Sequence, residues 1–320
     1  MSTISNPSLS AINSAAKSLI HGALVGIPTE TVYGLAADAE NEAAVARIYA
    51  VKGRPQDHPV IVHIGSVEYL NKWAINIPDY ALKLAKEYWP GPMTLILERS
   101  EIAKDFITGG QKSIGLRVPA HVTTLALLEE FHKLGGNGIA APSGNRFGAV
   151  SPTNAEAIQS ELGEFLDASQ DLIIDGGQSL VGVESTIIDC TGDFPTILRP
   201  GAITEEMITT TSSQTVKVSN QPKIRVSGSL DQHYSPKAKI SIGGKVCLGD
   251  GFIALSKLDT PEGSVRLASP QTLEEFARSL YAAMRDADER GINRIVVILP
   301  KGDGLAIAIR DRVNRAARKS

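Results

Sequence analysis

The fold is decided by LSAINSAAKSLIHGALVGIP, residues 9–28. In its first half, apolar residues recur every three or four positions, which predicts an amphipathic helix. The apolar face of that helix carries Ile12, Ala15, Ala16, Leu19 and Ile20. Gly22 follows where a helix C-terminal cap belongs, and ALVGIP continues at once as an apolar strand. Helices that lead straight into buried strands are typical of an α/β domain.

The alternation of helix and strand continues to about residue 200. Helices are expected near 41–50, 78–88 and 121–134 and after Ser151-Pro152, between strand-like runs such as VIVHI, MTLILE and SIGLRVP. Several runs are unbroken apolar sequence, which indicates a sheet that helices mostly cover. Adjacent strand-like runs near 171–198 indicate that the sheet is mixed. We therefore expect an α/β domain over residues 1–205, built on a mixed, twisted open sheet with helices.

A second, smaller domain is expected at the C-terminal end. Residues 206–236 are rich in Ser, Thr, Gln and Pro and show no sustained periodicity, which is typical of a linker. After it, KISIG, FIALS and RIVVILP read as strands, and helices are expected near 269–291 and 304–318. Residues 237–320 therefore predict a small Rossmann-like α/β domain, joined to the first by a long linker.

Length and composition narrow the class of protein. The chain has 320 residues, enough for two domains, and its net charge of −3 gives no general reason to expect nucleic-acid binding. The longest apolar runs, such as IVVIL at 295–299, are too short to span a membrane, and the first residues lack an export signal. A soluble, cytoplasmic protein without a membrane partner is expected. Cys190 and Cys247 lie in apolar runs without a metal-ligand cluster, so we expect two buried free thiols and no protein-built metal site.

Two cations stand close together in KGRPQDHP, residues 52–59. In an extended loop, the spacing of Lys52 and Arg54 aims both side chains the same way, and an ammonium beside a planar guanidinium suits a polyphosphate. Alternatively, the two cations complement the dipole at a helix C-terminus. The local sequence favours neither reading, and no phosphate-binding GxxxxGK[ST] motif occurs in the chain.

Small polar residues follow an apolar strand in APSGNRFGAVSPTNAE, residues 141–156. Ser143 and Asn145 offer hydrogen-bonding side chains, and Ser151-Pro152 reads as the N-cap and first residue of a helix. A helix N-terminus of this kind can bind an anion, although simple capping is the safer reading of the local sequence.

Arg117 and Arg199 interrupt the ends of apolar strands, where a charge needs a partner. That partner is either an internal carboxylate, such as Glu30 or Glu184, or an anionic ligand. His63, inside VIVHI, is by itself more often a core histidine than a functional group.

The loop PTETVYGL, residues 28–35, holds threonines and a carboxylate but no basic residue. Read alone, it is a polar turn with Thr29 as a local cap and Tyr33 as half-buried packing.

Together these segments resemble the YrdC-like threonylcarbamoyl-AMP synthases in their long, two-domain form. The matching motifs span residues 26–201 in order: PTETVYGL, KGRPQDHPVIVHI, WPGPMTLIL, SIGLRVP, AAPSGNRFGAVSPT, DGG with GVESTIID, and LRPG. The family's KxR and SxN signature stands here as Lys52, Arg54, Ser143 and Asn145, which the resemblance implies to be catalytic. The linker and the second domain resemble the family more loosely.

The resemblance implies an enzyme that joins L-threonine, bicarbonate and ATP into L-threonylcarbamoyl-adenylate and releases pyrophosphate. Mg²⁺ would arrive with ATP, and the product would pass to the tRNA threonylcarbamoyl transferase machinery that modifies adenosine 37. The residues implied to surround threonine are Thr31, His63, Arg117, Ala141 and Ser185. Those implied to hold ATP are Lys52, Arg54, His58, Ser113, Ser143, Asn145, Ser151, Arg199 and, from the linker, Tyr234. Many relatives carry asparagine at the position of His58.

Two other functions compete with synthesis. One is an RNA-binding module for tRNA or rRNA maturation, since the last helix carries cations at Arg310, Arg312, Arg315, Arg318 and Lys319. Weak tRNA contact is also compatible with synthesis. The other is the carbamoyl-adenylate chemistry of hydrogenase-maturation carbamoyltransferases, whose zinc-finger and acylphosphatase-like modules this sequence does not show.

Overall fold

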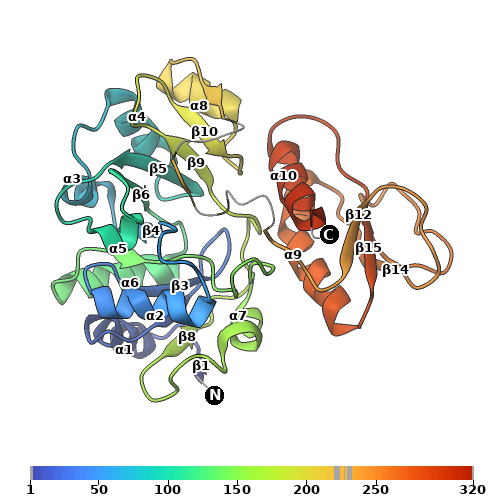
Figure 1. Ribbon diagram of the computed structural model, residues 1–320, viewed down its shortest axis with the longest axis horizontal. Helices are drawn as coiled ribbons and strands as arrows, with labels where there is room; N and C mark the ends of the chain where they lie inside the picture. Colours follow the sequence, from blue (N-terminus) through green and yellow to red (C-terminus); the bar gives the residue numbers. More distant parts are fainter. Residues whose placement is uncertain (1–2, 220–223, 227, 229–232, 319–320) are drawn as a thin grey trace.

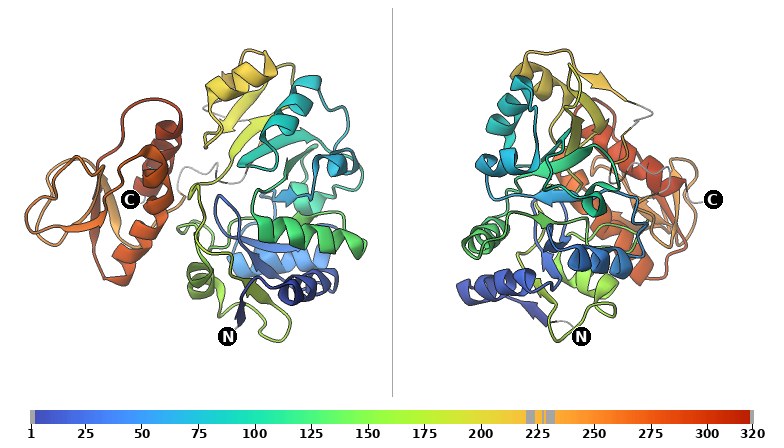
Figure 2. Two further views of the ribbon diagram at one scale, coloured as in Figure 1. Left: turned by 180° about the vertical axis from the view of Figure 1, so that it is seen from behind. Right: turned by 60° about the vertical axis from the view of Figure 1, so that its left-hand side comes forward.

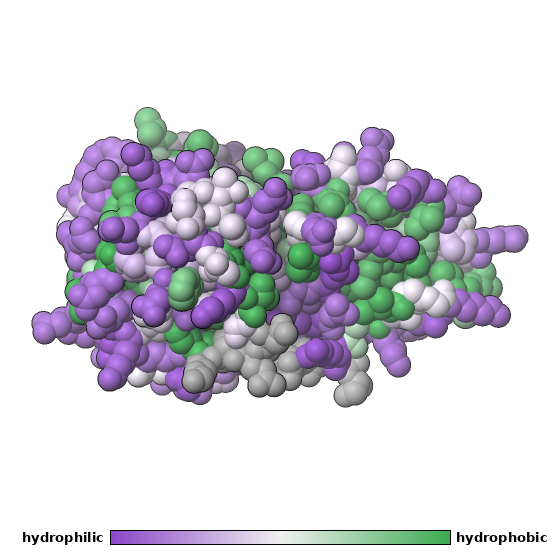
Figure 3. Space-filling view, turned by 90° about the horizontal axis from the view of Figure 1, so that it is seen from above, coloured by the Kyte–Doolittle hydropathy of each residue, from purple (hydrophilic) through white to green (hydrophobic). Residues whose placement is uncertain are grey.

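The computed structural model describes residues 3–219, 224–226, 228 and 233–318. They form a large N-terminal domain and a small C-terminal domain, which lie side by side in Figure 1. Seen from above, hydrophilic and hydrophobic residues are intermingled over both domains (Figure 3). No helix in the described ranges is long and apolar enough to cross a membrane.

The large domain is built on a mixed sheet, which in the described part of the chain has eleven strands. It contains parallel pairs, such as β4 (Ile61–His63) with β6 (Ser113–Arg117), and antiparallel pairs, such as β2 (Val25–Ile27) with β3 (Gly34–Asp38). In spatial order, the strands are β1 (Thr3–Ser5), β8 (Leu172–Ile174), β2 (Val25–Ile27), β3 (Gly34–Asp38), β7 (Ile139–Ala140), β4 (Ile61–His63), β6 (Ser113–Arg117), β5 (Met93–Glu98), β9 (Thr186–Asp189), β10 (Thr196–Arg199) and β11 (Lys217–Val218). The predicted mixed α/β sheet is confirmed.

Helices pack on this sheet in groups, and the two further views in Figure 2 show them around it. The predicted first helix has its capping serine, Ser8, and buries Ile12, Ala15, Ala16 and Leu19. It packs beside α6, while α4 packs beside α8. The helices of this domain are α1 (Leu9–Ile20), α2 (Glu42–Lys52), α3 (Leu70–Trp73), α4 (Asp79–Tyr88), α5 (Asp105–Thr108), α6 (Val122–Lys133), α7 (Ala155–Leu162) and α8 (Glu205–Ser212), with a 3₁₀ turn at Val67–Tyr69.

The small domain has a parallel sheet and two helices. Its strand order is β12 (Lys239–Ile242), β15 (Arg294–Val297), β13 (Gly251–Ile253) and β14 (Val265–Ala268). Helices α9 (Leu273–Glu289) and α10 (Leu305–Ala317) lie between this sheet and the large domain (Figure 1). The apolar core of the small domain takes in Val32, Val150 and Val183 of the large domain, so the two domains share buried contacts.

Three local expectations were wrong. Ser151 does not cap a helix, because α7 begins three residues after Pro152 and its N-cap is Asn154, whose side chain accepts from the amide of Ala157 at 2.8 Å. The expected linker opens with helix α8 and strand β11 rather than irregular chain. Cys190 is buried as expected, but Cys247 is exposed, because it lies in the turn before β13.

Candidate functional site

A pocket with about 620 Å³ of empty space, its open mouth included, gathers most of the predicted site residues. The expected residues that line it are Thr31, Lys52, Arg54, His63, Arg117, Ala141, Ser143, Asn145, Ser185, Arg199 and Tyr234. These residues come from seven separate stretches of sequence. The pocket therefore unites the two groups that the resemblance implied for threonine and for ATP.

Sheet pairing brings these stretches together. In the parallel register of β4 and β6, His63 lies directly beside Arg117. The amide of Ala141 donates to the carbonyl of Ile61 at 3.0 Å, which extends β7 along β4. Residues 28–35 are called the threonine loop below. Gly34 in this loop pairs with Ser143 in an isolated bridge, so the threonine loop lies against the loop that carries Ser143 and Asn145.

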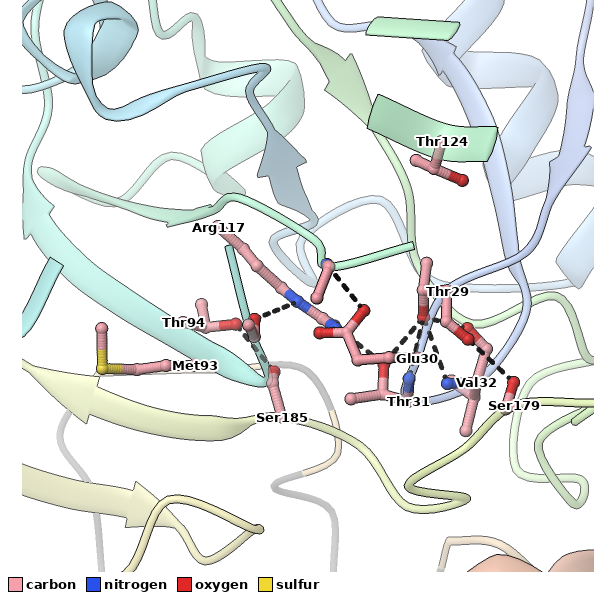
Figure 4. Close-up of polar contacts among 12 residues, drawn as sticks. Thr29, Glu30, Thr31, Val32, Met93, Thr94, Arg117, Thr124, Ser179 and Ser185 are labelled. Atoms are coloured by element: carbon pink, nitrogen blue, oxygen red, sulfur yellow. Dashed lines mark hydrogen bonds and ion pairs between the residues drawn. The ribbon is translucent and has the colours of Figure 1, made fainter. Parts of the chain in front are cut away.

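Arg117 is held by the threonine loop (Figure 4). Its guanidinium donates to Glu30 Oε1 at 2.6 Å, to Thr31 Oγ1 at 2.9 Å and to the Gly91 carbonyl at 3.2 Å. The internal carboxylate partner left open by the sequence is therefore Glu30. Arg117 and Glu30 are both buried, and three of the five guanidinium N–H groups are used in these bonds.

Ser185 and Arg199 form a second buried group. The Arg199 guanidinium donates twice to the Ser185 carbonyl, at 3.0 and 2.9 Å, and once to its hydroxyl at 3.1 Å. The same hydroxyl lies 2.7 Å from Thr94 Oγ1 (Figure 4). These contacts fix the serine of the VEST segment at the pocket wall.

Lys52 is the most unusual cation of the pocket. Its ammonium is 1% exposed and donates to two backbone carbonyls, those of Ser143 at 2.5 Å and Asn145. No carboxylate among the described residues forms an ion pair with it. Burial, with the nearby charge of Arg54, holds the pKa of Lys52 well below its usual value. An anion entering the pocket would relieve this unfavourable burial.

A row of aromatic rings closes one side of the pocket. Phe147 contacts the edge of His233 at 6.2 Å between ring centroids, and His233 contacts Tyr234 at 4.1 Å. The His58 ring lies edge-on to Phe147 at 5.4 Å, outside the pocket lining. His58, which was predicted to contact the nucleotide, thus lies behind Phe147, which does line the pocket.

Two further predicted residues lie outside the lining. Ser151 is fully buried and donates to Glu184 Oε1 at 2.6 Å. Ser113 lines a neighbouring hollow of about 280 Å³, mostly apolar, which Ile61 shares with the main pocket.

Sequence reasoning did not assign Glu184, Phe147 or His233 to the pocket. Glu184 was expected to pair with an arginine of its own domain, but its partner is Arg312 of α10, with Nε to Oε2 at 2.7 Å. Glu184 immediately precedes Ser185 in the VEST motif, and His233 immediately precedes Tyr234 at the end of the linker. Their position next to a predicted site residue was the sequence signal that could have identified them.

Three cations that the RNA-binding alternative would use on the last helix contact other groups of the protein. Arg312 is fully buried, Arg315 pairs with Asp311 at 2.9 Å, and Arg310 donates to the Pro300 carbonyl at 3.0 Å. Lys319 lies outside the described residues. These contacts weaken the sequence argument for an RNA-binding helix.

Two buried pocket histidines predict how stability depends on pH. Burial lowers the pKa of His63 and of His233 to about 3, and Arg117 adds to the shift at His63. An unfolded histidine titrates near about 6.5, so between that pH and about 3 the unfolded chain binds more protons. We expect the free energy of unfolding to fall by about 1–2 kcal/mol per histidine from pH 7.5 to 5.0.

Urea unfolding at the two pH values checks this expectation. His63→Gln should show a smaller loss than the parent protein, whereas His21→Gln, at an exposed position on the surface, should show the same loss. An equal loss in all three proteins would contradict the assignment to His63.

The chain matches two family models along nearly all of its length. Sua5_yciO_yrdC, described as "Telomere recombination", covers residues 17–201, and Sua5_C, described as "Threonylcarbamoyl-AMP synthase, C-terminal domain", covers residues 203–318.

Within the described residues, no group of three histidines, cysteines or carboxylates is placed to hold a metal ion.

Relatives of similar length share about a third of the sequence. The threonylcarbamoyl-AMP synthase of Pyrococcus abyssi is 36% identical over 333 residues, covering 96% of this chain and 94% of that protein. That of Bacillus subtilis is 35% identical over 331 residues, covering 96% and 92%. The crystal structure of P. abyssi Sua5 complexed with L-threonine superposes with a TM-score of 0.89 at 34% identity, covering 99% of this chain and 98% of that chain. The chain therefore belongs to the threonylcarbamoyl-AMP synthase family, in its two-domain form.

Proposed function

We propose that this protein joins L-threonine, bicarbonate and ATP into L-threonylcarbamoyl-adenylate and releases pyrophosphate. The observation that carries the proposal is a single buried pocket with two chemically different walls. One wall has hydroxyls and an arginine paired with Glu30, and the other has a buried lysine that forms no ion pair with a carboxylate of the described residues. An amino acid suits the first wall, and a polyphosphate suits the second.

Threonine would lie between Thr31, His63, Arg117 and Ser185, with the carbonyl of Ala141 near its polar groups. The two remaining N–H groups of Arg117 can take a carboxylate, while Thr31 Oγ and backbone carbonyls can accept from the ammonium and hydroxyl. Serine would lose only methyl contacts, a discrimination of about 1–3 kcal/mol.

ATP would lie with its phosphates at Lys52, Arg54, Ser143, Asn145 and Arg199. The base would lie toward the apolar hollow that Ile61 shares with the pocket, near Ser113. Mg²⁺ would enter on the phosphates, as part of the substrate. Tyr234 and His233 would cover the nucleotide from the linker.

The chemistry would run in two steps. The threonine amine forms a bond to the carbon of bicarbonate, and water leaves, which gives a carbamate. A carbamate oxygen then forms a bond to the α-phosphorus, and the bond to the β-phosphate breaks, which releases pyrophosphate. Both steps bring anions together, so fixed cations and N–H groups would contribute most of the rate enhancement.

Pyrophosphate release from ATP and bicarbonate, measured with each of several amino acids, tests the proposal. We expect strict dependence on threonine. Steeply salt-dependent tRNA binding without any threonine-dependent release would favour the RNA-binding alternative. The downstream tRNA threonylcarbamoyl transferase machinery and a cytoplasmic location are parts of the same proposal.

The two walls predict opposite kinetic effects. Thr31→Ala removes a hydroxyl that orients Arg117, so it should raise the KM for threonine about tenfold and leave the KM for ATP within about twofold. Arg54→Ala removes a cation beside Phe147 and should do the reverse. Steady-state pyrophosphate release with each substrate varied in turn measures both constants, and equal effects of the two variants would exclude this division.

A further inference from the structure

The Glu184 carboxylate connects the pocket wall with the small domain. Its Oε1 accepts from Ser151 of the large domain, and its Oε2 accepts from the Tyr281 hydroxyl at 2.9 Å and from Arg312 Nε at 2.7 Å. Tyr281 belongs to α9 and Arg312 to α10. A side chain of the pocket lining is therefore held in place mainly by the other domain.

Arg312 also contacts two other parts of the site. Its guanidinium lies 5.3 Å from the ring centroid of Tyr234, which stacks on Tyr281 at 5.7 Å. It donates to the Pro200 carbonyl at 3.0 Å, in the residue after Arg199. One fully buried guanidinium thus touches the VEST segment, the end of β10 and the linker tyrosine.

The backbone beside Glu184 is packed against the same helices. Gly182 has a φ of 77°, and a Cβ placed there would lie 2.3 Å from the Cα of Arg278 on α9. Val183 is buried in the core of the small domain. The VEST segment is consequently packed directly against α9 and the core of the small domain.

One partner of the Arg312–Glu184 ion pair is part of the pocket lining. Both Glu184 and Tyr234 line the pocket. Two further lining residues, Ser185 and Arg199, are the sequence neighbours of Glu184 and Pro200, which Arg312 contacts. Burial by itself would raise the pKa of Glu184, but the Arg312 and Arg199 guanidiniums and Ser151 lower it to about 2, so the carboxylate is ionised. Without Arg312, Arg199 is the next cation that acts on it.

The geometry points to Arg312 as a positioning residue of the synthase site. From the small domain, its guanidinium holds both the Glu184 carboxylate and the Tyr234 ring, and it thereby determines the position of the VEST segment. This inference rests on the proposed function. When Arg312 is absent, Glu184 should draw Arg199 away from Ser185, so threonine binding should weaken. The carboxylate should also titrate closer to neutral pH.

Kinetics of pyrophosphate release by the full-length chain test this role. Arg312→Met should raise the KM for threonine at least about tenfold and change the pH dependence of that KM between pH 6 and 9 relative to the parent. In the Glu184→Gln background, the same substitution should change that KM by no more than about twofold, because no buried carboxylate is left unpaired. Arg310→Met is the matched control on α10, since its guanidinium donates a hydrogen bond to the Pro300 carbonyl of its own domain, and it should behave as the parent.

Melting temperatures separate positioning from folding. If Arg312→Met does not fold, Arg312→Lys is tested instead, since it keeps the charge and loses the planar guanidinium. A several-fold rise in the KM for threonine in Arg312→Lys supports the positioning role of Arg312. Kinetic constants within about twofold of the parent in a folded Arg312 variant overturn it, as does an equal effect of Arg312→Met in both backgrounds. A parent protein without threonine-dependent release would instead contradict the proposed function.

Discussion

Replacing Lys52 with methionine should lower kcat for pyrophosphate release at least about 100-fold. The amine is buried, binds the carbonyls of Ser143 and Asn145 and has no ion-pair partner in the described part of the chain, so an anion in the pocket would be the group that stabilises its charged form. Removing one such group from the place where negative charge develops costs about 10²–10³-fold in rate. Single-turnover release at saturating ATP and threonine measures the effect without a contribution from substrate binding.

Two controls accompany Lys52→Met. Lys52→Arg keeps the charge but not the point-like geometry and should remain at least about tenfold impaired, since the two carbonyls are placed for an ammonium. Lys17→Met, at an exposed position of α1, should leave the rate unchanged. More than a third of parental activity in a folded Lys52→Met protein would remove Lys52 from the catalytic group.

Breaking the Arg117–Glu30 pair should produce a large loss of stability. The two side chains are 5% and 8% exposed and meet at 2.6 Å. Removing one partner of such a buried pair leaves the other charge uncompensated, at a cost of about 3–5 kcal/mol. We expect Arg117→Met to lower the free energy of unfolding by this amount in urea titrations, and to abolish threonine-dependent release.

The double variant Arg117→Met/Glu30→Gln should recover at least half of the lost stability, because neither buried charge remains. It should not recover activity. Lys133→Met removes the ammonium that pairs with Glu129 and Glu130 on the exposed face of α6 and should cost less than about 1 kcal/mol. If Arg117→Met also cost less than 1 kcal/mol, the Arg117–Glu30 pair would not be a significant source of stability.

Local patterns in the sequence predicted most of the fold. The helix over Leu9–Ile20 and the strands that follow it could be read from periodicity, because both their apolar faces and their end signals lie within about twelve residues. Ser151 shows where such reading fails. Ser-Pro resembles a helix start, yet the hydroxyl binds Glu184, and Asn154 three residues later is an equally good cap.

The pocket itself could be predicted only in part. The threonine loop, Lys52, Arg117 and Ser185 stand in motifs that a family resemblance identifies. The pairing of Glu184 with Arg312 spans 128 residues and two domains, and nothing in the neighbourhood of either residue signals the other. For the same reason, the fully buried Arg312 looked like one of several surface cations on a basic helix.

The shared core of the two domains has a consequence for protein engineering. Val32, Val150 and Val183 of the large domain are buried among side chains of the small domain. The point in the sequence where the large domain ends therefore does not separate two independent cores. A chimaera that carries the C-terminal domain of a distant relative would have to reproduce the faces of α9 and α10, or these valines would lose the surface that buries them. The two domains are therefore better exchanged together than singly.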